Sequence, residues 1–279
     1  MSNGLAFSQM AGADGRWALC SAKPAADLAG LVLEYQGYIE QGGPVLSQRQ
    51  VSTTVIPVIV NLGPAFRVDS AGQSGGAVDF GSFVAGLDGG HAAVAATGAS
   101  HCMQVDFTPL GAYRFFGLPM RELSGYVLPL GDVLKNELAA LEDRLYETAD
   151  WRGRIAILDS FVRARLRRSR PPSAEIVWAW QRLHASHGRT RISDLTAALD
   201  CSRKHLGERF SREIGRPPKT AARLLRFEHL HGLIGGAATP DWSALAYDCG
   251  YADQAHMVRV FRHFAGTTPT GYLSEQRLI

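Results

Sequence analysis

WSALAYDCGYADQAHMVRVFRHFAGTTPTGY, residues 242–272, is the stretch that decides the fold of the C-terminal part of the chain. Its start predicts a short helix over 242–249, because three apolar residues recur on one helical face: Leu245, Ala246 and Cys249. Gly250 predicts the end of that helix, since a residue without Cβ easily adopts the left-handed conformation. Asp253 is a typical N-cap and predicts the start of a second helix.

The second helix is predicted by apolar residues at helical spacing, namely Met257, Val260, Phe261 and Phe264. Gly266 predicts its end, and Thr268 followed by Pro269 predicts the cap and first turn of a third helix. A helix, a tight turn and a second helix are the outline of a helix-turn-helix unit. The second helix of such a unit can lie in the major groove of DNA.

The same outline occurs a second time, in ISDLTAALDCSRKHLGERFSREIGRPP, residues 192–218. Four landmarks return after 51 positions, so that Leu206, Phe210, Gly215 and Pro218 correspond to Met257, Phe261, Gly266 and Pro269. The helix before each turn repeats after 50 positions, which makes the second turn one residue longer. Two units with matching stop signals are harder to obtain by accident than one.

At these residues the chain resembles the AraC/XylS family of transcription regulators. The resemblance is carried by Gly250, Tyr251, Asp253, Met257, Arg259, Phe261, Arg262, Gly266, Pro269 and Tyr272. It implies two helix-turn-helix units on either side of a linker helix, here residues 218–234, and an N-terminal sensor domain that is often cupin-like. Arg226 stands where that family has a recurring linker-helix Arg, with either a structural or a DNA-contacting role. The chain departs from the family at Asp200, Ala221, Leu230 and Leu273.

The first 110 residues predict many short strands separated by turns rich in Gly and Pro. The predicted strands are 31–39, 54–61, 65–69, 77–85, 92–97 and 102–108. This pattern is typical of an antiparallel sandwich or small barrel. VDFTPLGAYRFFGLP, residues 105–119, resembles a run in poorly characterised N-terminal domains of AraC-like regulators. The predicted fold is therefore α+β in two domains, with a β-rich, cupin-like first half and an all-α second half.

Three regions follow from this pattern: a sensor or dimerisation domain at 1–150, a basic helix and Pro linker at 151–172, and a DNA-binding domain at 173–279. Helices are predicted over 132–149, with Asp132 as N-cap, over 151–168 and over 174–186. The first of these carries an apolar stripe formed by Val133, Leu134, Leu138, Leu141 and Leu145. That stripe either covers the barrel or forms a dimer contact.

Charge is distributed unevenly along the chain. Residues 1–150 carry 8 Lys or Arg and 15 Asp or Glu, whereas residues 151–172 carry 7 and 1. Residues 173–279 carry 14 and 10. A basic second half fits a module that contacts DNA phosphates.

The outward faces of the two recognition helices predict which residues read DNA. The predicted base-facing residues are Ser202, Arg203, Lys204, Gly207 and Glu208 in the first unit and Gln254, Ala255, Val258 and Arg259 in the second. Lys and Arg suit guanine, Gln suits adenine, and Glu suits cytosine. Arg212 and Arg262 are better placed for phosphates. Gly207 has no side chain, so it either permits close approach or leaves its helix with few base contacts.

Other classes of protein are less well supported. No apolar run is long enough to span a membrane, and the four Cys residues are far apart, which suits a reducing cytoplasm. The rival hypothesis is a DNA-binding domain fused to a cupin-like domain with enzymatic or metal-dependent activity. His91 and His101 are the only His residues in the first half, and they lack the spacing of paired metal ligands.

We therefore predict a cytoplasmic regulator that is not an enzyme and carries no cofactor or metal. Its predicted partners are double-stranded promoter DNA and a small-molecule effector of unknown identity. The resemblance also allows contact with RNA polymerase and assembly into a homodimer.

Overall fold

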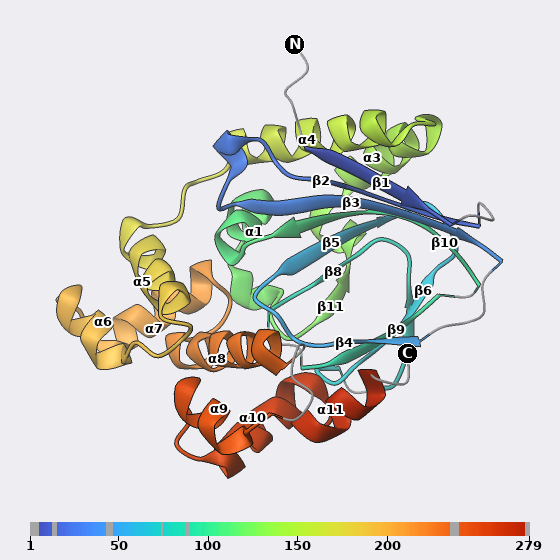
Figure 1. The fold of residues 1–279 in the computed structure, drawn as a ribbon. Coiled ribbons are helices and arrows are strands. Elements are labelled where there is room, and N and C mark those ends of the chain that lie inside the picture. Colours follow the sequence, from blue (N-terminus) through green and yellow to red (C-terminus); the bar gives the residue numbers. More distant parts are fainter. Residues whose placement is uncertain are drawn as a thin grey trace.

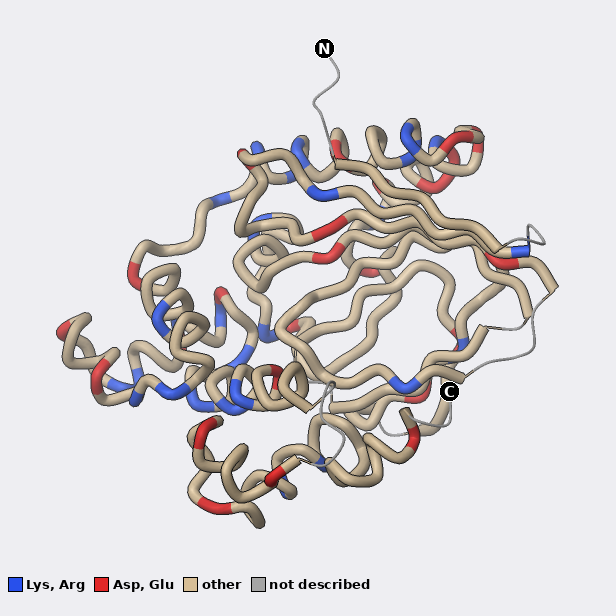
Figure 2. The backbone as a smooth tube through the Cα atoms, viewed as in Figure 1, with Lys and Arg blue, Asp and Glu red and all other residues tan. Residues whose placement is uncertain are grey.

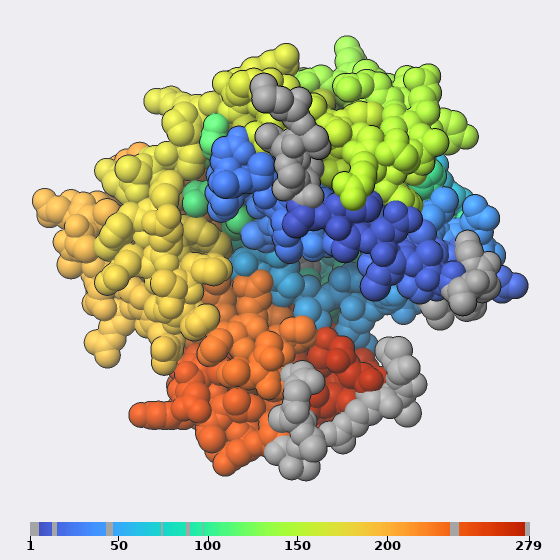
Figure 3. Space-filling view, turned by 45° about the horizontal axis from the view of Figure 1, so that its top comes forward, coloured from blue at the N-terminus to red at the C-terminus, as the bar shows by residue number. Residues whose placement is uncertain are grey.

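The computed structural model describes residues 6–12, 16–42, 47–73, 75–87, 90–96, 98–234 and 240–276. A strand-rich half built from the first part of the chain lies beside a helical half built from the last part (Figure 1). The helices of the second half lie directly against the strand-rich half (Figure 3). The fold class predicted from the sequence, a β-rich first half followed by an all-α second half, is confirmed. None of the described helices is long and apolar enough to cross a membrane.

Within the described residues the larger sheet has seven antiparallel strands, in the order β1-β2-β3-β10-β5-β8-β11. Their bounds are Phe7–Ala11, Trp17–Ala22, Val32–Gln41, Ala99–Phe107, Ile56–Asn61, Phe83–Ala85 and Val127–Pro129. The smaller sheet has the order β4-β9-β6-β7, with bounds Ser47–Gln50, Ala92–Ala95, Phe66–Ser70 and Val78–Phe80. The two sheets face each other (Figure 1), and a cavity lies between them.

β10 shows how the larger sheet separates two environments. Met103, Val105 and Phe107 are buried in the main core of the strand-rich half, which also includes residues of the helices packed on that face. The alternate residues Gln104 and Asp106 face the space between the sheets. This follows from the two-residue period of a strand.

The outer face of the larger sheet is covered by helices α1 (Pro109–Phe116), α3 (Asn136–Glu147) and α4 (Trp151–Arg168). Between them lie the short 3₁₀ helix η2 (Met120–Glu122) and the helix α2 (Leu130–Leu134). A further 3₁₀ helix, η1, covers Ala26–Leu28. α4 has the predicted bounds of 151–168, and its N-cap Asp150 accepts a hydrogen bond from the Gly153 amide at 2.8 Å.

The single helix predicted over 132–149 is wrong. Lys135 adopts a left-handed φ of 52° and divides the segment into α2 and α3. Asp132 is therefore a residue inside α2 and not an N-cap. The break lets apolar residues on both sides of it, Leu134 and Leu141, reach the same core. The apolar stripe thus packs against the larger sheet, as one of its two interpretations required.

The strand predicted over 77–85 is also wrong, because it consists of two strands in different sheets. β7 ends at Phe80 and β8 begins at Phe83, with Gly81 and Ser82 forming the bend. The Ser82 hydroxyl accepts from the Asn61 amide at 2.9 Å and donates to Glu142 at 2.5 Å, which fixes the bend. Strands β1, β2, β4 and β11 have no counterpart among the predicted strands.

The helical half contains α5 (Ala174–Ala185), α6 (Ile192–Ala198), α7 (Arg203–Glu213), α8 (Pro218–Ile234), α9 (Trp242–Asp248), α10 (Gln254–Ala265) and α11 (Pro269–Gln276). Their buried residues form a second core, which includes Phe210, Phe227 and Phe261. α8 is the linker helix that the sequence predicts, with the same bounds.

Candidate nucleic-acid interface

The first helix-turn-helix unit consists of α6 and α7. Asp200 occupies the turn with a φ of 46°, a left-handed conformation that Asp adopts more readily than most residues with a Cβ. Ser202 caps α7 by accepting from the His205 amide at 3.1 Å. Leu206, Phe210 and Ile214 are buried, as their spacing predicts.

The end of α7 is tied to the start of α5. The buried Glu213 carboxylate accepts from the Ser173 amide at 2.7 Å and from the Ser173 hydroxyl at 3.0 Å. Arg209 adds an ion pair with Glu175 at 2.5 Å on the more exposed side. These contacts hold α7 at a fixed angle within the helical half.

The second unit consists of α9 and α10, and its turn and helix ends lie where the sequence predicts them. Gly250 adopts a φ of 74° in the turn, and Gly266 adopts a φ of 75° after α10. The Asp253 carboxylate accepts from the His256 amide at 2.6 Å, which confirms it as the N-cap of α10. Met257, Val260, Phe261 and Phe264 are buried.

The linker helix α8 packs against the second unit through aromatic rings. The Phe227 ring lies 5.2 Å from the rings of both Phe261 and Phe264, measured between centroids. Arg226 donates to the Gly250 carbonyl at 3.3 Å, and burial lowers the pKa of its guanidinium. Arg226 was expected to have either a structural or a DNA-contacting role. Its hydrogen bond to Gly250 is a structural contact, because it holds the turn between α9 and α10.

The predicted base-facing residues lie on the surfaces of α7 and α10. Those with exposed side chains are Ser202, Arg203, Lys204 and Glu208 on the first unit and Gln254, Ala255 and Arg259 on the second; Gly207 and Val258 are partly exposed. Arg212 and Arg262 are exposed near the ends of the same helices. Lys and Arg are frequent along the helices of the second half, as Figure 2 shows. Two of these polar groups already have partners, since Ser202 caps α7 and Gln254 accepts from the Ser243 hydroxyl at 3.2 Å.

The first recognition helix borders the strand-rich half, which the sequence did not indicate. Arg121 of η2 lines a shallow hollow together with Lys204, Gly207 and Glu208 of α7. Beside this hollow, Arg216 donates to the Leu87 carbonyl at 3.3 Å. One side of the predicted reading face of α7 is therefore next to η2.

A second contact joins the segment between β4 and β5 to the helical half. The Glu228 carboxylate of α8 accepts from the Thr54 amide at 2.7 Å and from its hydroxyl at 3.1 Å. The Ser52 amide donates to the Phe264 carbonyl of α10 at 3.1 Å. Burial raises the pKa of Glu228, against the lowering effect of the Thr54 hydrogen bonds.

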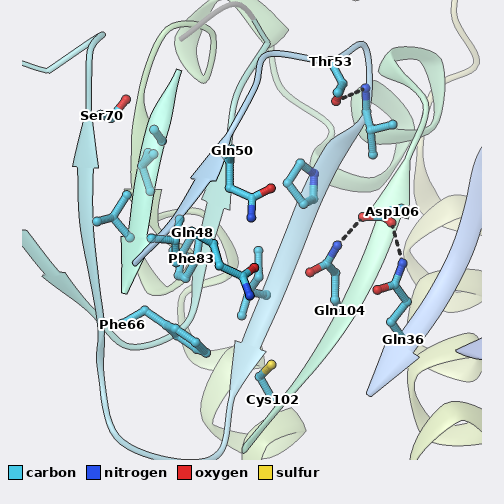
Figure 4. Close-up of a pocket in the computed structure, with 18 of the residues that line it drawn as sticks. Gln36, Gln48, Gln50, Thr53, Phe66, Ser70, Phe83, Cys102, Gln104 and Asp106 are labelled. Carbon is cyan, nitrogen blue, oxygen red and sulfur yellow. Dashed lines mark hydrogen bonds between the residues drawn. The ribbon is translucent and has the colours of Figure 1, made fainter. Parts of the chain in front are cut away.

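A cavity of about 660 Å³ lies between the two sheets. Its volume is within the range of small-molecule sites in proteins. It is lined by polar residues from β3, β4 and β10 and by apolar residues from β5, β6, β8 and β9 (Figure 4). Its lining includes Gln36, Tyr38, Glu40, Gln48, Gln50, Ser52, Thr53, Ile59, Phe66, Val68, Phe83, Val94, Gln104 and Asp106.

The metal-dependent alternative gains no support from the positions of the two His residues. His101 packs against Trp151 and lies 2.8 Å from the Arg154 guanidinium, and burial lowers its pKa. His91 lies beside Gly266 of the helical half, and burial lowers its pKa as well. Among the described residues, no group of three or more His, Cys, Asp or Glu side chains could hold a metal ion.

Two family models match the chain. A helix-turn-helix domain matches residues 195–275, which covers both units described above. A domain of unknown function, DUF6597, matches residues 21–129 in the strand-rich half. No curated protein matches the chain.

Solved structures of AraC-type regulators are similar to this chain. ToxT from Vibrio cholerae, in its unsaturated fatty acid bound form, is 13% identical, with a TM-score of 0.44 over 87% of this chain and 95% of that chain. A probable AraC family transcriptional regulator from Rhodopseudomonas palustris CGA009 is 28% identical, with a TM-score of 0.34 over 37% of this chain and 97% of that chain.

The repeated unit, the linker helix and the matching domain model all fall in the same part of the chain. The protein carries a helix-turn-helix domain of the AraC type at its C-terminus and is a DNA-binding transcription regulator.

Proposed function

We propose that this protein reads a promoter with α7 and α10. We further propose that a small molecule bound between its two sheets controls how the helical half is oriented relative to the strand-rich half. Two recognition helices joined by α8 would enter successive major-groove faces about 34 Å apart. One copy would then read an asymmetric site with two boxes, and a dimer would read two such sites.

One observation carries the regulatory part of this proposal. Ser52 and Thr53 line the cavity, while the backbone at Ser52 and Thr54 is hydrogen-bonded to α10 and α8. A ligand that moves this segment must strain or break bonds to the DNA-binding half. The cavity and the recognition helices are therefore connected by a contact of a few residues.

The position of η2 indicates which recognition helix depends on the orientation of the two halves. Because Arg121 borders the hollow beside Lys204 and Glu208, a DNA duplex bound to α7 would lie close to η2. The reading residues of α10 are not among the residues of this hollow. We infer that access to α7, more than access to α10, depends on how the two halves are placed.

Replacement of Arg259 by Ala tests base reading. A promoter fragment from upstream of the protein's own gene is titrated with protein across a salt series. We expect Arg259→Ala to lose about 1–3 kcal/mol of binding free energy and to relax the preference at one base pair, because Arg can bond to both guanine acceptors.

Arg262→Ala is the matched control on the same helix. It should weaken binding uniformly across sequences and reduce the salt slope by about 1, as expected for a phosphate contact. Equal affinity of wild type and Arg259→Ala at every salt concentration, with both proteins folded by circular dichroism, would show that Arg259 does not read a base.

Glu228 provides the test of the contact between the halves. Glu228→Gln keeps a side-chain oxygen that can accept from Thr54, whereas Glu228→Leu leaves the buried Thr54 amide without its acceptor at a cost of about 1–3 kcal/mol. We expect faster hydrogen exchange at the Thr54 amide in Glu228→Leu and unchanged exchange in Glu228→Gln. Unchanged exchange in both variants would mean that the contact does not hold the halves together.

The pH dependence of the same pair has a definite sign. Burial raises the pKa of Glu228 in the folded protein, so its contribution to stability is present below the unfolded pKa of about 4.3 and is lost as pH rises through the folded value. Glu228→Gln has no such dependence. Urea unfolding should therefore show Glu228→Gln gaining stability relative to wild type as pH rises above about 4.3.

A further inference from the structure

The polar wall of the cavity is set by the register between β3 and β10. The antiparallel pairing places Gln104 opposite Gln36 and Asp106 opposite Glu34. Since alternate residues of a strand share one face, the side chains of Gln36, Gln104 and Asp106 all face the space between the sheets. Figure 4 shows these three side chains together on that wall.

Asp106 is held in place by amide groups and not by a cation. Its two carboxylate oxygens accept from Gln104 Nε2 at 2.7 Å and from Gln36 Nε2 at 3.1 Å. Each oxygen keeps a second lone pair for another donor. A second acidic side chain on the same wall, Glu40, accepts from the Tyr38 hydroxyl at 2.9 Å.

The facing part of the cavity is largely apolar. The rings of Phe66 and Phe83 meet edge to face with centroids 6.0 Å apart, and Val68 and Val94 lie on the same small sheet as Phe66. Gln48 and Gln50 project from β4 near this surface (Figure 4). A bound molecule would therefore meet an apolar surface on one side and acceptors on the other.

The charge of the cavity is one-sided. None of the described residues that line it is Lys or Arg, whereas Glu40 and Asp106 are acidic. Two basic residues close to the lining have other partners: Lys23 bonds to Glu34 at 3.1 Å, and Arg49 donates to the Ala265 carbonyl at 3.1 Å. An anionic head group would lose water without gaining a cationic partner, which is strongly unfavourable.

We propose that this cavity selects an organic amine, with an apolar body against Phe66 and Phe83 and a protonated nitrogen bonded to Asp106. The inference rests on the proposed function, in which this cavity is the effector site. A protonated amine has only donors, and the free lone pairs of Asp106 supply the matching acceptors. The negative charge of Asp106 and Glu40 disfavours organic carboxylates and phosphates.

The test measures the binding of small fragments to the full chain without DNA. The fragments share an apolar group and differ in their polar group, which is an amine, an alcohol or a carboxylate. One such set is tryptamine, tryptophol and indole-3-acetate, and another is octylamine, octanol and octanoate. Binding is followed by NMR on methyl groups that line the cavity, those of Ile59, Val68 and Val94, so only ligands inside it count. We expect amines to bind at least about tenfold more tightly than the matched carboxylates, with the alcohols between them.

Asp106→Asn tests the assigned acceptor. The Gln36 and Gln104 amides can turn to present oxygen or nitrogen, so Asn should be accommodated without the charge. We expect amine affinity to fall about tenfold and alcohol affinity to change by less than about threefold. Asp79→Asn, on the exposed strand β7, is the control and should change neither.

Carboxylates that bind the cavity as tightly as amines would overturn the proposal, and so would a set in which no fragment shifts the cavity methyls. Amine affinity unaffected by Asp106→Asn would overturn the assignment of the acceptor. Should the variant not fold, the wild-type comparison of the polar groups decides the proposal. Because no DNA is present, failure here leaves promoter reading by α7 and α10 standing, and failure of promoter reading leaves this result unchanged.

Discussion

Phe227→Ala is expected to destabilise the DNA-binding half by about 3–5 kcal/mol, the usual loss for a fully buried Phe. Phe227 has no exposed surface and lies at the centre of the contact between α8 and α10. The cavity left by its ring would remove contacts from both Phe261 and Phe264. Because those rings hold α10 against the linker helix, the variant should also lose specific promoter binding.

Urea unfolding and promoter titration measure the two effects of Phe227→Ala. Leu233→Ala is the control, because Leu233 is on the same helix but is 45% exposed, so its loss should cost little. A loss of less than about 1 kcal/mol in Phe227→Ala would show that the second unit does not depend on this aromatic contact.

Gly188→Ala is the second change with a large expected effect. Gly188 follows α5 with a φ of 73°, and an added Cβ would lie 2.1 Å from the Ala222 carbonyl oxygen of α8. The left-handed backbone alone costs a residue with a Cβ about 1–2 kcal/mol. The steric contact with backbone adds to this, because α5 and α8 would have to separate, so we expect a total loss above about 2 kcal/mol.

Gly207→Ala is the matched control for Gly188→Ala and should act in the opposite direction. Gly207 is inside α7, and an added Cβ would meet nothing within 4 Å. Ala in a helix interior is more favourable than Gly by about 0.5–1 kcal/mol, so the melting temperature should rise. Destabilisation by Gly207→Ala would mean that α7 is packed more closely than its surroundings indicate.

Gly207→Ala also bears on promoter reading. Reduced promoter affinity in a stabilised protein would favour the interpretation that Gly207 permits close approach of α7 to the groove. Unchanged affinity would favour few base contacts by this helix. The same variant thus separates the two explanations that the sequence left open.

Much of the helical half could be predicted because its signals are local. The bounds of α8, the cap at Asp253 and the left-handed turn at Gly250 each depend on residues within a few positions. Helical periodicity also identified which residues of α7 and α10 are buried, which leaves the opposite faces available. Whether those faces read bases stays a prediction that Arg259→Ala tests.

Local signals were less reliable in the strand-rich half. The break at Lys135 was missed, because no Gly or Pro marks it and its left-handed backbone serves packing of Leu134 and Leu141 on a distant sheet. Strand β4, with the sequence SQRQ, has no apolar alternation to reveal it. The bend between β7 and β8 depends on a contact of Ser82 with Glu142, 60 positions away.

The sequence by itself determined that this protein has two helix-turn-helix units joined by a helix, because helix periods, caps and turn residues act over short distances. Only the tertiary structure decided that Asp106 and Gln36 share one wall of a cavity, that Thr54 bonds to Glu228, and that Arg121 borders α7. These contacts join residues 70 or more positions apart. They follow from strand register and from the packing of one half against the other, which no local pattern specifies.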